Sequence, residues 1–429
     1  MSSLKFMEKL LDGVAVEWKT LGDISELVRG NGLQKKDFTE TGVPAIHYGQ
    51  IYTYYGLSTE RTKSFVSPDL ARTLRKVNNG DVVITNTSEN IEDVGTPLVY
   101  LGKEQAVTGG HATIIKPGRF LSGKYFAYFA LTETFALQKR KFAKGTKVID
   151  VSATDMSKIQ IPIPCPDNPK KSLEIQAEIV RILDTFTELT TELTTELTTE
   201  LNLRKKQYNY YRDQLLSFED GEVEWKAFGD PSVGEFIRGG GLQKKDFTES
   251  GVGCIHYGQI YTHYGTSADK TKTYVSEEFF KKARKARTGD LVIATTSEND
   301  DDVCKAVAWL GKEEIAVSSD ACIYKHKLNP KFVSYFFQTD KFQKQKKQHI
   351  TGTKVRRVNA DDLAKLLIPI PCPDNPKKSL EIQSEIVRIL DTFTELTAEL
   401  TAELTARKKQ YEYYRDLLLS FPKPDKESE

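Results

Sequence analysis

Two long stretches of the chain carry apolar residues at the spacing of an amphipathic helix. In the first, the steps from Ile175 through Ile179 and Ile182 to Leu193 alternate between four residues and three. The second repeats this pattern from Ile382 to Leu396 and beyond. Such spacing is typical of the seam of a coiled coil. We expect two helices of about 45 residues each, roughly 65 Å long. Neither can bury its seam alone, so we expect them to pair in antiparallel fashion.

A run of Thr-Glu-Leu tetrads occupies the middle of each predicted helix. Leucine recurs at every fourth position from Leu189 to Leu201, and again from Leu396 to Leu404. The first run has four tetrads and the second has one fewer. Repeated steps of four locally unwind a supercoil. These tetrads are either a spacer of defined length or a solvated helix with no further role.

The other segments have the pattern of small mixed domains. Short β-rich runs at 44–48, 80–84 and 113–115 are bounded by Gly, Asp and Asn and predict strands. Residues 125–131 and 332–337 predict buried helices, so the fold class is α+β rather than alternating βαβ. The three prolines of 161–166 predict a stiff extended connector. Ser172 is the expected N-cap of the helix that follows.

The whole chain is a tandem repeat with a period of about 207 residues. Residues 161–190 match 368–397 at 29 of 30 positions. The middle of each unit diverges more. Asn86 aligns with Thr295, and Gly110-His111 aligns with Ser319-Asp320. A shared scaffold with altered positions predicts two related but different recognition surfaces, arranged with internal pseudo-twofold symmetry. The predicted parts are a first domain (1–165), a central coiled-coil helix (166–219), a second domain (220–372), a C-terminal coiled-coil helix (373–421) and a tail (422–429).

Composition excludes several classes of protein. Hydrophobic residues make up 39% of the chain and charged residues 28%, which is typical of a folded domain. No run approaches the ~20 apolar residues of a membrane span, and the first residues lack the pattern of a secretory leader. Five cysteines without a Cys-x-x-Cys pair disfavour disulfides and a cysteine zinc site. We expect a cytoplasmic protein.

Net charge alternates along the chain. It is +4 over 1–165, −4 over 166–221, +4 over 222–372 and −3 over 373–429. The two predicted domains are therefore mildly basic, which permits a polyanionic partner without requiring one.

Catalytic and metal-binding motifs are almost absent. The sequence has no phosphate loop, no dinucleotide fingerprint and no His-Glu-x-x-His. Glu17 and Lys19, with Asp12 upstream, resemble half of a nuclease metal site, but a first strand with Trp18 packed inward explains them better, because a metal site needs a convergent set of ligands. His47 and His256 have no second ligand at a suitable spacing. We therefore predict no catalytic residue and no metal site.

Two groups of residues in each half have the chemistry of nucleic-acid contacts. One mixes amide, cationic and aromatic side chains that can read bases, pair with phosphates or stack, although a polar strand with inward tyrosines would look alike. The other is a Gly-Thr turn flanked by cations, which suits phosphate contact but also occurs as an ordinary charged turn. The predicted contacts are Gln34, Lys35, Lys36, His47, Tyr48, Gln50, Tyr52, Asn86, Thr87, Ser88, Asn90, His111, Lys144, Thr146 and Lys147 in the first half, and Gln243, Lys244, Lys245, His256, Tyr257, Gln259, Tyr261, Thr295, Thr296, Ser297, Asn299, Thr353, Lys354, Arg356 and Arg357 in the second.

Taken together, these features resemble the specificity subunit of a type I restriction–modification system. The resemblance covers essentially the whole chain and rests on the Gly145-Thr146 turn, the Ile-Pro-Ile-Pro element, the helix start at 174–183 and the tetrads, nearly all of which recur in the second half. It implies two target recognition domains, each reading part of a split DNA sequence, with the paired helices setting the gap.

The resemblance also implies the partners and their cofactors. The subunit would be non-catalytic and would dock two methyltransferase subunits and the restriction (translocase-nuclease) subunits on double-stranded DNA. It would bind no cofactor itself, and S-adenosylmethionine, Mg and ATP would be used by the partner subunits. The alternatives are a stand-alone duplicated nuclease, disfavoured by the absent motifs, and a protein-only coiled-coil adaptor, disfavoured by the divergence of the domains.

Overall fold

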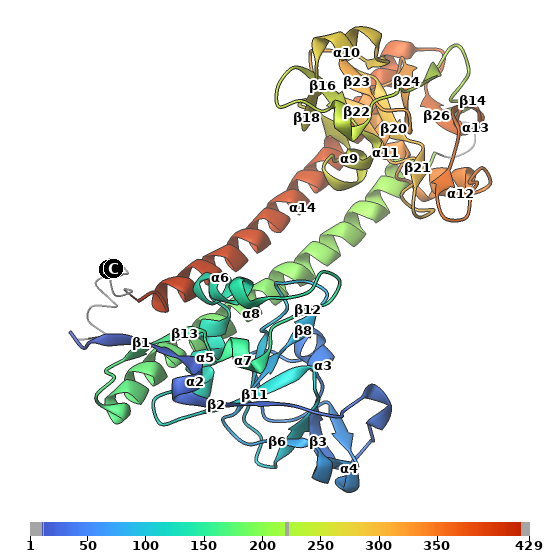
Figure 1. Cartoon of the computed structure of the whole chain (residues 1–429). Helices are drawn as coiled ribbons and strands as arrows, with labels where there is room; N and C mark the ends of the chain where they lie inside the picture. Colours follow the sequence, from blue (N-terminus) through green and yellow to red (C-terminus); the bar gives the residue numbers. More distant parts are fainter. Residues whose placement is uncertain (1–10, 12, 219–222, 422–429) are drawn as a thin grey trace. The chain divides into compact units, whose positions relative to one another are not determined.

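A computed structural model describes residues 11, 13–218 and 223–421, which form two compact units (Figure 1). Unit 1 comprises Met1–Glu196 and Glu403–Glu429, and unit 2 comprises Leu197–Ala402. Two long helices are divided between them: α8 (Pro169–Leu215, 47 residues) and α14 (Pro376–Leu418, 43 residues). The difference of four residues equals the one tetrad that the second copy lacks. Asp12 and the tail 422–429 lie outside the described residues.

The two units have the same strand order. In unit 1 a five-stranded sheet runs β2-β11-β7-β9-β4 and a four-stranded sheet runs β5-β3-β10-β6, and unit 2 repeats both orders as β15-β24-β20-β22-β17 and β18-β16-β23-β19. Two-stranded ribbons complete each unit: β1-β13 and β12-β8 in the first, β14-β26 and β21-β25 in the second. Most pairs are antiparallel, but β3–β10 and β4–β9 are parallel, as are β16–β23 and β17–β22. The α+β class and the duplication are confirmed.

The elements of the first copy have the following bounds. The strands are β1 (Val16–Thr20), β2 (Ser25–Arg29), β3 (Val43–Ile46), β4 (Ser58–Thr59), β5 (Ser64–Val66), β6 (Arg75–Val77), β7 (Val82–Thr85), β8 (Thr87–Ser88), β9 (Pro97–Tyr100), β10 (Ala106–Thr108), β11 (Ala112–Pro117), β12 (Ile149–Asp150) and β13 (Gln160–Pro164). The helices are α2 (Leu21–Ile24), η1 (Lys35–Asp37), α3 (Tyr48–Thr53), α4 (Pro68–Thr73), α5 (Gly123–Ala130), α6 (Glu133–Phe142) and α7 (Ala153–Met156), followed by α8.

The second copy repeats this series with small differences. The strands are β14 (Val223–Ala227), β15 (Gly234–Arg238), β16 (Val252–Ile255), β17 (Ser267–Ala268), β18 (Thr273–Val275), β19 (Lys285–Ala286), β20 (Leu291–Ala294), β21 (Thr296–Ser297), β22 (Ala306–Trp309), β23 (Ile315–Val317), β24 (Ala321–His326), β25 (Arg356–Arg357) and β26 (Leu367–Pro371). The helices are η2 (Lys244–Asp246), α9 (Tyr257–Thr262), α10 (Glu277–Lys282), α11 (Pro330–Phe336), α12 (Asp340–Lys347) and α13 (Ala360–Leu363), followed by α14.

The central strand β7 shows why these sequences fold into layers. Its residues are buried on both faces, because successive side chains of a strand point to opposite sides. Val82 and Ile84 join the core beneath α5, whereas Val83 joins a second core with residues of the four-stranded sheet. The predicted strands and the two predicted buried helices are therefore confirmed, with bounds shifted by a few residues.

The proline-rich segment is a strand rather than a free connector. As β13 it pairs antiparallel with β1, and Trp18 lies opposite Pro162. Proline is tolerated here because the ribbon has only two strands, so an absent N–H need not break a second ladder. Trp18 packs edge-on against Phe129, which confirms the inward-facing tryptophan of the first strand.

The N-cap prediction was wrong by one helical turn. Helix α8 begins at Pro169, and the side-chain oxygen of Asn168 accepts a hydrogen bond from the backbone N–H of Lys171. Ser172 is buried inside the first turn, where its hydroxyl accepts a hydrogen bond from Gln176. Proline at the first helical position is favoured because its missing N–H has no partner to lose.

The predicted apolar seam packs against two different surfaces along its length. At the start of α8, Ile175 and Ile179 are buried in the core of domain 1 and not against a second helix alone. Farther along, Phe186 contacts Tyr414 of α14 with ring centroids 6.0 Å apart, although Phe186 remains 38% exposed. The matching pair in unit 2 is Tyr211 with Phe393, stacked at 5.4 Å.

The direction of the helix pair follows from these contacts. In unit 1 the hydroxyls of Thr187 and Tyr411 lie 3.0 Å apart, one turn from the contact between Phe186 and Tyr414. Rising numbers on α8 therefore meet falling numbers on α14, as the antiparallel prediction requires. Among the described residues, no helix is long and apolar enough to cross a membrane.

Candidate nucleic-acid interface

A two-stranded ribbon brings the Gly-Thr turn of domain 1 to the end of its central strand. Strand β12 pairs with β8, placing Asp150 opposite Thr87. The turn that precedes β12 is closed by backbone hydrogen bonds of 2.8 and 3.0 Å between Lys144 and Asp150. Gly145 occupies the turn at a φ of 99°, where a Cβ would lie 2.0 Å from the carbonyl oxygen of Val148. Glycine is therefore required at this position.

Domain 2 builds the same ribbon from different side chains. Strand β25 pairs with β21, and Arg357 lies opposite Thr296. Gly352 has a φ of 86° and a comparable approach to the carbonyl of Val355. In both domains the turn and the strand end thus form one polar rim. We call these rim 1 (Thr87–Ser88, 144–150 and the side chains that touch them) and rim 2 (Thr296–Ser297, 351–357 and their neighbours).

Aromatic and imidazole groups extend rim 1. The rings of His47 and Tyr48 have centroids 4.6 Å apart, and Tyr48 is 4.8 Å from His111. His111 Nδ1 lies 2.9 Å from the hydroxyl of Thr87, and the hydroxyl of Tyr52 donates to the carbonyl of the same threonine at 2.8 Å. The structure therefore brings these five predicted residues into one connected cluster.

The segment that carries this cluster is a helix and not the polar strand considered as an alternative. Helix α3 starts at Tyr48, and His47 Nδ1 caps it by accepting the N–H of Gly49 at 3.1 Å. Burial lowers the pKa of His47, and the nearby Lys35 lowers it further. A neutral imidazole is the form that can accept this hydrogen bond.

Several predicted contacts are held inside the fold. Asn86 is fully buried and its side-chain oxygen accepts from Thr113 at 2.8 Å. Gln50 donates to Ser64 at 2.6 Å, and its counterpart Gln259 donates to Thr273 at 3.0 Å. A base contact by any of these amides requires an existing hydrogen bond to break or the side chain to turn outward. Asn90 and Asn299 are exposed, but each donates to an aspartate three residues later, at 2.6 and 2.7 Å.

Cations lie at both rims, and some of them are held in ion pairs while others are not. Lys144 forms an ion pair of 2.9 Å with Asp155. Hydrogen bonds from Lys158 and then from Lys144 hold the pKa of the Asp155 carboxyl well below its usual range. Lys147 is exposed and makes no ion pair with another described residue. In domain 2, Arg356 pairs with Asp300 at 2.8 Å.

The remaining predicted residues are distributed as follows. Those exposed to solvent are Gln34, Lys35, Lys36, Thr146, Gln243, Lys244, Lys245, Thr353 and Lys354. Those half-buried are Ser88, His256, Tyr257, Tyr261, Thr295 and Ser297. Phe38 contacts His47 edge-on at 5.6 Å, so the short helix η1 with its two lysines lies next to the rim cluster. None of these placements tests a DNA contact, and all of them stay predictions.

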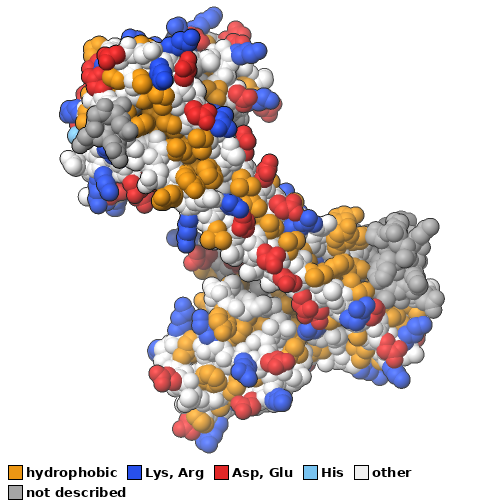
Figure 2. All heavy atoms as spheres, turned by 180° about the vertical axis from the view of Figure 1, so that it is seen from behind, with side chains coloured by type: hydrophobic (Ala, Val, Ile, Leu, Met, Phe, Trp, Pro, Cys, Tyr) orange, Lys and Arg blue, Asp and Glu red, His pale blue; other side chains and the backbone are white. Residues whose placement is uncertain are grey.

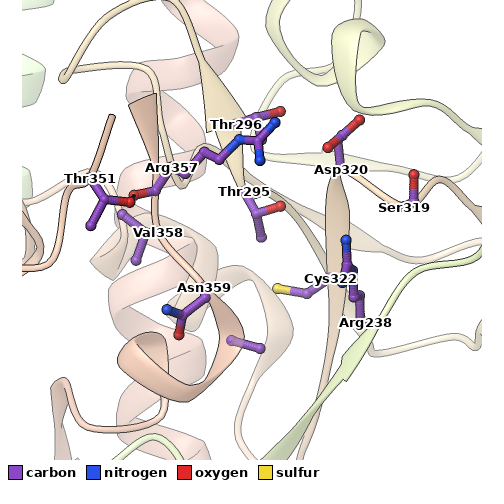
Figure 3. A pocket seen from close by; sticks show the side chains of 11 residues that line it. Arg238, Thr295, Thr296, Ser319, Asp320, Cys322, Thr351, Arg357, Val358 and Asn359 are labelled. Carbon is purple, nitrogen blue, oxygen red and sulfur yellow. Dashed lines mark hydrogen bonds between the residues drawn. The ribbon is translucent and has the colours of Figure 1, made fainter. Parts of the chain in front are cut away.

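A pocket of about 310 Å³ opens beside rim 2. Figure 3 shows Arg357 and Asp320 at its edge and Arg238 approaching from a neighbouring strand. Arg238, Ser319 and Asp320 were absent from the predicted contacts, as was Arg29 in domain 1. Arg238 stands 57 positions before Thr295 in the chain, so only the tertiary fold brings it to the rim. The divergence of Ser319-Asp320 from Gly110-His111 was the signal that could have found the other two.

Charge is not concentrated on the face drawn in Figure 2. Cationic and anionic side chains are interspersed there within each unit. The net positive charge of each domain is therefore a weak guide to the interface, and the polar rims are the better candidates.

Comparison with known proteins identifies the family. The family model "type I restriction modification DNA specificity domain" matches residues 14–203 and again residues 222–407. The chain belongs to this family. Each match spans one globular domain and most of one long helix, in agreement with the duplication seen in the fold.

Curated relatives carry the same description over their full length. The chain is 33% identical over 434 residues to the type I restriction enzyme EcoR124I/EcoR124II specificity subunit of Escherichia coli, covering 99% of each chain. A putative type I specificity subunit of Haemophilus influenzae is 28% identical, with 97% of this chain and 98% of the relative covered. The chain is thus a specificity subunit of a type I restriction–modification system.

A solved structure supports the fold. One chain from a study of complex assembly and conformational transition in a type I restriction–modification system matches with a TM-score of 0.62. It is 14% identical, and the match covers 94% of this specificity subunit and 97% of that chain. At this identity the match shows the shared fold alone.

Proposed function

We propose that this specificity subunit reads a split DNA sequence, with one half-site for each domain. The observation that carries the proposal is the pair of rims, which occupy the same place in sheets of the same strand order but carry different side chains. A reader of one continuous site has no use for two such surfaces, whereas a split site requires them. Exposed cations and half-buried aromatic rings at both rims suit phosphate contact and base contact respectively.

We also propose that the subunit is non-catalytic. His47 Nδ1 caps a helix, and Glu17 forms an ion pair of 3.0 Å with Lys19 on β1. Among the described residues, no three His, Cys, Asp or Glu side chains gather as a metal site would require. In this proposal, methylation and cleavage reside in partner subunits, which use S-adenosylmethionine, Mg and ATP.

Two copies of one partner fit the duplicated helices. Tyr210 and its counterpart Tyr413 are both 62% exposed, and the neighbouring Tyr211 and Tyr414 are both 41% exposed. These matched tyrosines lie near the ends of α8 and α14, where 204–213 and 407–416 differ at one position. Equivalent surfaces bind equivalent partners, so we assign them to two methyltransferase subunits, to which restriction subunits add.

The spacer between the half-sites follows from the same helices. Helices α8 and α14 are continuous through their tetrads, so each behaves as a rod of 1.5 Å per residue, about 6 Å per tetrad. We propose that the tetrads define the number of base pairs between the two half-sites.

A methylation map tests the proposal. The chain is expressed with the methyltransferase subunit of its own system, and N6-methyladenine is mapped over a random-sequence DNA library. We expect one motif made of two half-sites at a fixed gap, and no methylation by the chain alone. Turnover by the isolated chain, or a partner complex that methylates one continuous site, would contradict the proposal.

The repeat itself supplies a sharp variant. Replacing residues 16–160 with 223–367 joins the domains at sequences that are the same in both copies, Val-Glu-Trp-Lys and Ile-Pro-Ile-Pro. The resulting protein carries rim 2 twice. It should methylate a motif in which the second half-site occurs twice, as an inverted repeat at the original gap.

A further inference from the structure

The two rims place different charges at the same positions of the fold. In domain 1, Arg29 ends β2 and donates to the carbonyl of Gly110 at 3.1 Å, while its guanidinium lies 4.0 Å from the carboxylate of Asp150. His111 is engaged with Thr87, as described above. The arginine and the aspartate at this place in rim 1 therefore contribute no net charge.

Rim 2 exchanges two of these groups. Arg238 ends β15 as Arg29 ends β2, but the position of Asp150 is taken by Arg357, since both face the threonine of the paired strand. The position of His111 is taken by Asp320. The backbone carbonyl of His111 accepts the N–H of Asn86, and that of Asp320 accepts the N–H of the equivalent Thr295. Within the described residues, neither Arg238 nor Arg357 forms an ion pair.

The exchange leaves an unneutralised pocket. Two guanidinium groups and one carboxylate line the same 310 Å³ space, which is shown in Figure 3 with the hydroxyls of Thr295, Thr296 and Ser319. Two guanidinium groups against one carboxylate leave an excess of positive charge and unused donors, which a ligand with acceptors would complement. The pocket is therefore shaped for a group that accepts hydrogen bonds from arginine and donates one to a carboxylate.

The chemistry of base pairs narrows the ligand. Guanine presents two adjacent acceptors, N7 and O6, in the major groove, and these match the fork of a guanidinium. The paired cytosine presents an amino group there, which a carboxylate accepts. An A·T pair has no two adjacent acceptors, and a phosphate diester has no donor to offer the carboxylate of Asp320. The combination of donors and one acceptor-only group thus favours a G·C pair.

We propose that Arg238, Arg357 and Asp320 read a G·C base pair in the second half-site. Domain 1 makes no such contact at the equivalent place, because its arginine is already paired. The inference rests on the proposed function, since it assumes that rim 2 faces DNA, and it adds which residues determine specificity and for which base pair.

Substitutions in the pocket test the inference through the same methylation map. Arg357→Lys keeps the charge but removes the fork, and it should relax the guanine requirement at one position of the second half-site by roughly 5- to 150-fold. The side chain of Asp320 forms no hydrogen bond with another described residue, so Asp320→Ala should relax the base requirement at the same position without removing a contact within the fold. Arg287→Lys is the matched control, because Arg287 is exposed and pairs with Glu314 at 2.7 Å outside the pocket. The first half-site serves as an internal control in every sample.

The outcomes separate the inference from the proposed function. A wild-type motif with no G·C pair in the second half-site overturns the inference and leaves the split-site reading intact. So does an unchanged motif in Arg357→Lys together with a salt slope lowered by about one in Arg357→Gln, since lysine preserves a phosphate contact and glutamine removes it. The absence of any two-part motif with an active partner overturns the proposed function itself.

Discussion

Lys139 offers a test of how each domain holds the loop behind its rim. Its side chain is only 6% exposed, and its Nζ donates to the carbonyls of Glu92 and Val94 in the loop between β8 and β9. Lys346 makes the matching bonds in domain 2 and is 2% exposed. Because this loop directly follows β8, the buried ammonium connects the core to the polar rim.

The pKa of Lys139 makes this contact measurable. Burial lowers it to about 8, against 10.5 for an exposed lysine. Between these pH values the unfolded chain binds a proton that the folded chain does not, so the free energy of unfolding rises with pH. Burying the charged ammonium of Lys139 lowers the free energy of unfolding below pH 8, and this destabilisation is relieved above pH 8, where the folded side chain is neutral. Integration from pH 7 to pH 9.5 gives about 2 kcal/mol in favour of the folded state.

The change to make is Lys139→Met, which removes the titrating group and keeps the length of the side chain. The stability difference, wild type minus variant, should increase by about 2 kcal/mol from pH 7 to pH 9.5. Of the three tryptophans, Trp18 is the one that belongs to unit 1. Unfolding by urea can therefore be followed in that unit through the fluorine NMR signal of fluorotryptophan at position 18. Lys141→Met, on the exposed side of the same helix, is the control and should give a flat difference. A flat difference for Lys139→Met as well would refute the reasoning.

The remaining predictions concern the interface and the helices. Deleting residues 195–198 shortens α8 by about 6 Å and adds a rotation of roughly 40° about its axis. The same two half-sites should then be methylated at a shorter gap. Altered bases at an unchanged gap would contradict the spacer proposal. Lys147→Gln should lower the salt slope of DNA binding by about one, whereas Lys144→Gln should change it less because that lysine is paired within its own domain; equal slopes would reject the distinction. Gln34→Ala should change the bases read in the first half-site, while Gln50→Ala should mainly lower the unfolding free energy of unit 1; the reverse pattern would reassign the two amides.

The fold was largely predictable because its signals are local or repeated. Heptad spacing predicts both long helices, and the internal repeat predicts two equivalent α+β domains from the sequence alone. The errors came from tertiary context. Ile175 and Ile179 fit a coiled-coil seam, but the nearest apolar surface is the core of their own domain, and burial there is equally compatible with the pattern. The strand β13 was missed because proline content speaks against a sheet unless the sheet has only two strands.

The candidate site was predictable in its chemistry and less so in its members. Polar and aromatic residues near α3 and the Gly-Thr turn do meet at one rim, because β8 pairs with β12. The sequence could not show that Gln50 and Asn86 turn inward, since an amide suits a buried hydrogen bond as well as a base edge.

The arginine that ends β2 or β15 shows why a duplicated chain reveals more than a single domain would. Arg29 and Arg238 are the same residue type at the same place, and neither stands in a motif. Their difference lies in the partner: position 150 is aspartate in one copy, and its counterpart 357 is arginine in the other. The first copy therefore closes an ion pair, while the second leaves two cations directed to a pocket. Specificity at such a rim can change by replacing the neighbour of a reading residue, without touching the fold or the reading residue itself.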